Sequence, residues 1–152
     1  FSRSSIWLAT ELPQVNPSPE NIVARPESPI VRQCYFVHHP PGLSLEEAQL
    51  YWRMNHGPLV RSLAPTLRLR RYMQVHMVLG PHIDPISGPR GKMEAPFMGL
   101  AEVWYDGVES AASRVMSEGA QAIEQLIEDE AKFIDFSRSA SWAGKEHVFI
   151  DR

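Results

Sequence analysis

A proline follows a histidine and a glycine inside a helical sequence, and this stretch constrains the fold more than any other. Residues 51–60 read Tyr-Trp-Arg-Met-Asn-His-Gly-Pro-Leu-Val. Pro58 has no N–H, its ring clashes with the carbonyl four residues earlier, and it disfavours helical angles at Gly57. We therefore expect the helix to break or kink just past His56, and Pro58 to begin a second short helix that runs to about Leu63. His56 would lie at a helix end, where unpaired carbonyls favour positive charge.

The residues before this interruption have the pattern of an amphipathic helix. Ser44 and Glu47 have the spacing of a capping box, in which each side chain bonds the other residue's backbone N–H. Apolar residues follow at steps of three and four, which indicates a buried helix face. A later helix is predicted from Asp106, with an interruption at Gly119, and its acidic residues are expected on a solvated face: Glu124, Glu128 and Glu130.

Strand patterns surround the two predicted helices. These stretches are rich in β-branched, aromatic or alternating apolar residues and cover residues 30–39, 67–79, 98–105 and 141–150. The order is therefore strand, helix, strand, strand, helix, strand, which is the split βαβ order of an α+β, ferredoxin-like fold with an antiparallel sheet. One helical layer covers only one face of such a sheet, so the other face needs a partner.

Alternation along residues 67–79 divides this strand into two faces. The more apolar face is expected to pack under the helices, and the amphipathic face is expected to line a cavity. The first holds Met73, Val75, Met77 and Leu79, and the second holds Tyr72, Gln74, His76 and Val78.

Residues 1–29 contain five prolines and are predicted to form an extended arm before a domain of residues 30–152. Apolar residues among the prolines indicate that the arm packs on a surface, which is either its own domain or a partner subunit. A long segment rich in glycine and proline, residues 80–96, is predicted to be a loop that covers the mouth of the cavity.

Four stretches, in the right order, resemble motifs of the EthD-domain family: Asn55–Val60, Arg71–His76, Gly99–Asp106 and Asp129–Asp135. The resemblance extends over about residues 30–150 and implies a dimeric α+β barrel, formed as a homodimer of ferredoxin-like subunits. Related proteins include polyketide cyclases, lactone isomerases and haem-degrading mono-oxygenases. The fold alone does not choose among these reactions.

Composition excludes several classes of partner. With 152 residues, the chain fits one domain, and its net charge of −3, with scattered basic residues, argues against nucleic acid and anionic membranes. No apolar run approaches the ~18 residues of a membrane span. The single cysteine, Cys34, is expected to be a buried strand residue and fits a reducing compartment, so we expect a cytoplasmic protein.

Cofactors and metals are not expected. The six histidines lack the spacing of a metal site, and no glycine-rich phosphate loop follows a strand. The histidines are better suited to general acid–base chemistry, because imidazole both takes and gives a proton near neutral pH. His76, Tyr72 and His56 are the candidate catalytic residues. Gln74, Trp104, Trp52 and Phe36 are the candidate substrate-binding residues.

The predicted function is to bind and convert a small hydrophobic or aromatic oxygenated metabolite by cofactor-free proton transfer, as in a cyclase, dehydratase or isomerase. The competing interpretation is a non-catalytic ligand-binding or accessory protein. In that case His56 would cap carbonyls freed by Pro58, and His76 would be a satisfied structural residue.

Overall fold

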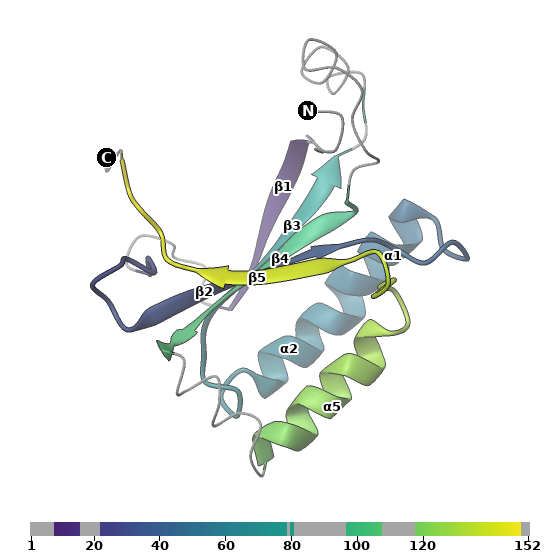
Figure 1. Ribbon diagram of the computed structural model, residues 1–152. Helices are drawn as coiled ribbons and strands as arrows, with labels where there is room; N and C mark the ends of the chain where they lie inside the picture. Colours follow the sequence, from purple (N-terminus) through teal and green to yellow (C-terminus); the bar gives the residue numbers. More distant parts are fainter. Residues whose placement is uncertain (1–7, 16–21, 79, 81–96, 108–117, 150–152) are drawn as a thin grey trace.

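The computed structural model describes residues 8–15, 22–78, 80, 97–107 and 118–149. Within these ranges one antiparallel sheet has the strand order β1-β3-β4-β2-β5, formed by β1 (Leu8–Val15), β2 (Ile30–Val37), β3 (Leu69–Val78), β4 (Gly99–Asp106) and β5 (Ala140–Gly144). The helical segments are α1 (Leu45–Tyr51), η1 (Trp52–His56), α2 (Gly57–Leu63) and α5 (Glu118–Glu130), and all lie on one face of the sheet (Figure 1). β4 lies between β2 and β3, which confirms the predicted split βαβ, ferredoxin-like arrangement.

Part of the predicted arm forms an extra strand of the same sheet. β1 pairs antiparallel with β3, from Leu8 opposite Val78 to Val15 opposite Tyr72. It is an edge strand, where proline is tolerated because one side of the strand has no ladder hydrogen bonds to lose. Residues 8–15 of the arm therefore pack on their own domain, which is one of the two surfaces considered for the arm.

The helix runs through Pro58 without a break, so of the two expected outcomes, a break or a kink, the break is wrong. Gly57 has helical angles, φ −56° and ψ −50°, and its N–H donates to the carbonyl of Trp52, five residues earlier, in a π-helical turn. Pro58 cannot donate to Met54, and such a wide turn lets a helix continue past the gap. Pro58 does lie in the first turn of α2, which ends at Leu63. The capping box of Ser44 and Glu47 is present as predicted.

The two faces of β3 are reversed relative to the prediction. Tyr72 and Gln74 lie under the helices, where the Trp52 indole N–H donates to the Tyr72 hydroxyl at 2.9 Å and the Gln74 amide donates to the Trp52 carbonyl at 3.0 Å. Met73 lies on the opposite face and packs with Trp104 against residues 22–24 of the arm. The amphipathic face can be buried because its polar groups bond to one another and to the helix.

Candidate functional site

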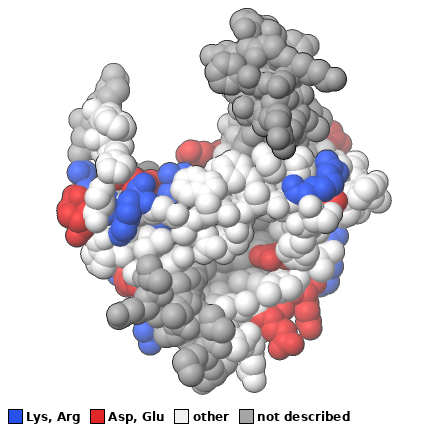
Figure 2. Space-filling view, viewed as in Figure 1, with Lys and Arg blue, Asp and Glu red and all other residues white. Residues whose placement is uncertain are grey.

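A cavity of about 550 Å³ lies between the sheet and the helices. The surface in Figure 2 is hollowed between these two layers. Apolar side chains of α2 and α5 form much of its wall, including Val60, Ile123 and Ile127. The polar lining groups are few, as is usual for a site that binds a small organic molecule. They are Gln33, Tyr35, His56, Tyr72, Glu130, Ser139 and Ser141.

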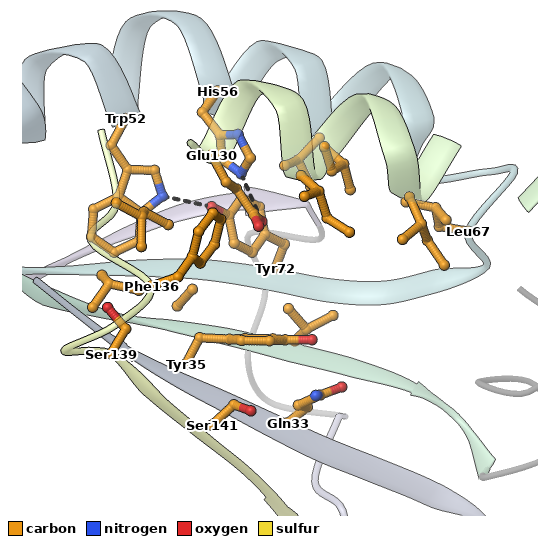
Figure 3. Close-up of a pocket in the computed structure, with 18 of the residues that line it drawn as sticks. Gln33, Tyr35, Trp52, His56, Leu67, Tyr72, Glu130, Phe136, Ser139 and Ser141 are labelled. Atoms are coloured by element: carbon orange, nitrogen blue, oxygen red, sulfur yellow. Dashed lines mark hydrogen bonds and ion pairs between the residues drawn. The ribbon is translucent and has the colours of Figure 1, made fainter. Parts of the chain in front are cut away.

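His56 points from the π-helical turn into this cavity, towards Glu130 (Figure 3). Its Nδ1 lies 2.9 Å from Oδ2 of Asp129. Asp129 also accepts hydrogen bonds from the Tyr51 hydroxyl at 2.6 Å and from Nζ of Lys132 at 3.0 Å. An ionised carboxylate can only accept, so Nδ1 of His56 carries the proton and Nε2 keeps its lone pair. In the described ranges the hydrogen-bond partner of the His56 ring is the Asp129 carboxylate and not a backbone carbonyl, so the interpretation of His56 as a cap of freed carbonyls is wrong.

The electrostatics favour neutral His56 beside ionised Asp129. Burial lowers the pKa of His56, although the neighbouring Asp129 partly opposes this. Burial also pushes the pKa of Asp129 upward, but hydrogen bonds from Tyr51, His56 and Lys132 outweigh it and leave that pKa below its usual range. The imidazole is therefore available as a base at neutral pH.

Glu130 lines the cavity next to His56, with Oε1 3.8 Å from Nε2 of the imidazole. That separation is too long for a hydrogen bond. Burial, aided by the charge of Asp129, raises the pKa of Glu130 to about 7. Glu130 is half-buried at the cavity, with 30% of its side chain exposed, and so departs from the expected solvated face, whereas Glu124 and Glu128 are exposed. The missed signal is helical spacing, because Glu130 follows Ile123 and Ile127 on one stripe of α5.

Tyr72 reaches the cavity from β3, below His56 and Glu130 (Figure 3). Its hydroxyl oxygen accepts hydrogen bonds from Trp52 Nε1 at 2.9 Å and from Gln74 Nε2 at 3.2 Å. Burial raises the pKa of Tyr72, so its hydroxyl stays protonated. Within the described part of the chain that hydroxyl donates to no other group, and its proton is available to a ligand. Trp52 itself forms part of the cavity wall.

His76 does not line this cavity, so its predicted position is wrong. Its ring stacks on Trp52 with centroids 4.6 Å apart, and its Nε2 lies 3.1 Å from the amide oxygen of Gln74. It borders a separate, smaller hollow beside Arg53 and Gln49. Burial, together with the charge of Arg53, lowers the pKa of His76 to about 4. The position follows from the reversed faces of β3, because the helix covers His76.

The other predicted substrate-binding residues are divided between the two sides of the sheet. Gln74 is fully buried and reaches the site only through its hydrogen bond to Tyr72. Trp104 lies on the outer face, where the Arg71 guanidinium stacks 4.5 Å above its ring. Phe36 is also on that face and stacks on Trp142. Strand alternation places Trp104 and Phe36 opposite the cavity side of β4 and β2.

Sequence reasoning missed the strand residues that form the polar floor. Gln33 and Tyr35 of β2 and Ser141 of β5 line the cavity (Figure 3). Alternation puts Gln33 and Tyr35 on one face with Val37, and the apolar Val37 was the available signal that this face is covered.

No group of three or more histidine, cysteine, aspartate or glutamate side chains in the described ranges could hold a metal ion. In the same ranges, no helix is both long and apolar enough to cross a membrane. The expected cover from residues 80–96 falls almost entirely outside the described residues.

The family model for the EthD domain matches residues 40–137. The chain also resembles the crystal structure of an EthD family protein from Bacillus halodurans, with a TM-score of 0.53 and 19% identity over 78% of this chain and 99% of that chain. A second crystal structure, of a dimeric protein of unknown function and ferredoxin-like fold from Bacteroides fragilis, gives a TM-score of 0.52 and 8% identity over 78% and 98% of the two chains. Comparison with curated proteins gave no match. At these identities the two structures support a common fold.

Proposed function

This chain belongs to the EthD-domain family, and we propose that its cavity binds and converts a small hydrophobic or aromatic oxygenated metabolite by cofactor-free proton transfer. The observation that carries the proposal is the orientation of His56. Nδ1 of His56 donates to Oδ2 of Asp129, 2.9 Å away, and the free Nε2 meets an apolar cavity beside Glu130.

Each polar group at this end of the cavity has a chemical role in the proposal. Nε2 of His56 takes a proton from a carbon next to a carbonyl group. The Tyr72 hydroxyl donates a hydrogen bond to the enolate oxygen that forms, and protonated Glu130 returns a proton to the intermediate. Asp129 acts as a positioning residue, because it fixes the tautomer of His56. Cyclases, dehydratases and isomerases all use such a step.

A second candidate is a non-catalytic ligand-binding or accessory protein. The observation that favours it is that the same hydrogen bonds connect separate helices. Tyr51 of α1 and His56 of η1 both bond Asp129 of α5, so the polar cluster also stabilises the helical layer.

We also propose that the domain forms a homodimer through the outer face of the sheet. An aromatic patch formed by Phe36, Phe97 and Trp142 lies there, and Trp142 is 50% exposed. A structural neighbour is described as dimeric, which supports a dimer without specifying its interface.

Deuterium exchange into the ketone β-tetralone tests the catalytic proposal without knowledge of the natural substrate. NMR in D₂O measures replacement of the hydrogens next to its carbonyl. We expect the protein to accelerate exchange over buffer by a factor on the order of 10² or more, the usual contribution of a positioned general base. Saturable binding without accelerated exchange would support the accessory role, and neither binding nor exchange would contradict both candidates.

A further inference from the structure

The floor of the cavity has polar groups at two places in one row across the sheet. Tyr72 of β3 and Gln33 of β2 are both paired with Val103 of β4, which lies between them. Their backbones are two strand spacings apart, about 10 Å. All three residues line the cavity. Along this row the floor is therefore polar at Tyr72, apolar at Val103 and polar again at Gln33.

Side chains of the helices also reach the cavity at the end near Tyr72. Figure 3 places His56 and Glu130 above Tyr72, and Gln33 with Ser141 on the strands away from them. Burial is the main cause of the raised pKa of Tyr72, and the charge of Glu130 adds to it, which agrees with their proximity. A ligand that touches both ends must be elongated and apolar between its polar ends.

The amide of Gln33 is oriented by a neighbour outside the cavity lining. The Tyr105 hydroxyl donates to Oε1 of Gln33 at 3.1 Å. With the oxygen engaged, the amide nitrogen of this cavity-lining residue has no protein acceptor for its hydrogens in the described ranges. Gln33 therefore presents a hydrogen-bond donor to a ligand, although the sequence marks it only as a polar residue on a strand.

We infer that the cavity recognises an elongated aromatic ligand with an oxygen function at each end. One oxygen lies beside His56, Glu130 and Tyr72, and the other accepts a hydrogen bond from Gln33. This inference deepens the proposed function and rests on it for the chemistry at the His56 end. A volume of about 550 Å³ is in the usual range for a small-molecule site and exceeds what one aromatic ring fills.

Two biphenyl compounds test the inference by calorimetry. p,p′-Biphenol and p-phenylphenol have the same rings and differ by one terminal hydroxyl. We expect the wild-type protein to bind p,p′-biphenol about three- to tenfold more tightly, the effect of one added neutral hydrogen bond. Gln33→Leu should reduce this preference to within about twofold of equal affinity. Gln125→Leu, the same substitution at an exposed position of α5, should retain it.

Gln33→Met provides a second variant of similar side-chain length without an N–H donor, in case the leucine variant does not fold. Equal affinity for the two compounds in the wild type, no binding of either, or a preference that survives loss of the amide would overturn the inference. Failure of the proposed function would give a different result. The wild type would prefer p,p′-biphenol and yet leave β-tetralone exchange at the buffer rate.

Discussion

Asp129 and Glu130 are consecutive residues of α5, and their environments shift their pKa values in opposite directions. Three donors surround Asp129, and their hydrogen bonds outweigh burial, so its pKa is lowered. Burial and the adjacent charge of Asp129 raise the pKa of Glu130 to about 7, and no donor in the described ranges compensates for them. Two carboxyl groups whose pKa values differ in this way can serve as a fixed anion and as a proton donor within one site.

This difference predicts how stability depends on pH. As the pH rises from about 4.5, the unfolded chain loses the Glu130 proton while the folded protein keeps it up to about pH 7, so the free energy of unfolding falls across this window. Glu130→Gln removes the charge and should raise the melting temperature at about pH 8 by roughly 2–4 °C, the effect of ~1 kcal/mol for a chain of this length. At about pH 5 the gain should be much smaller.

Glu128→Gln is the matched control, because Glu128 is exposed on the same helix. Thermal unfolding followed by circular dichroism at both pH values gives the comparison. A gain for Glu130→Gln that is the same at both values would show that Glu130 carries no burial penalty.

Among the secondary-structure elements, the close contact between β4 and the π-helical turn determines where the cavity wall lies. A methyl group added at Gly99 would lie 2.5 Å from the Val75 carbonyl oxygen and 2.6 Å from the Trp52 ring. Trp52 is held by its stacking on His76 and by its hydrogen bond to Tyr72, so it cannot easily move aside. Only glycine lets the strand approach the helix this closely.

Gly99→Ala should therefore lower the free energy of unfolding by about 2–3 kcal/mol, the cost of overpacking a core whose neighbours are fixed. Gly42→Ala is the control, because an added methyl group there meets no heavy atom within 4 Å. Urea unfolding measures both variants. Equal stability of Gly99→Ala and the wild type would contradict the contact described between β4 and Trp52.

The elements were predictable where the signal is local. The Ser44–Glu47 capping box and the alternation in β3 and β4 depend on neighbouring residues, and they predicted the helix start and the strands. Which face of β3 packs under the helices was not predictable in this way. It depends on residues 22–24, which are distant in sequence and cover Met73. The π-helical turn before Pro58 was also not predicted. Local rules say that proline interrupts a helix, but they do not say whether the helix ends there or continues through a wider turn.

At the scale of the whole molecule, the described residues place helices on one face of the sheet and a partial cover on the other. Residues 22–24 pack on Trp104, and the carboxylate of Glu146 bonds the Ala24 N–H at 2.6 Å and the Trp104 indole at 2.9 Å. This leaves the aromatic patch of Phe36, Phe97 and Trp142 towards the β2–β5 side. Such a patch is typical of a protein interface.

A homodimer through this patch is the corresponding prediction. Sedimentation equilibrium at micromolar concentration should give twice the chain mass of 17.2 kDa. Trp142→Ser should shift the protein towards monomer, whereas Met54→Ser, at a 58% exposed position on the helical layer, should not. A wild-type protein that sediments as a monomer would contradict the predicted dimer.

The most direct measurement of the central claim is β-tetralone exchange in two histidine variants. His56→Gln removes the base held by Asp129, and His147→Gln removes an exposed histidine outside the cavity lining. We predict that His56→Gln lowers the protein-dependent exchange rate by a factor on the order of 10² or more, while His147→Gln keeps the wild-type rate. A folded His56→Gln variant that exchanges β-tetralone as fast as the wild type would contradict the assignment of His56 as the base.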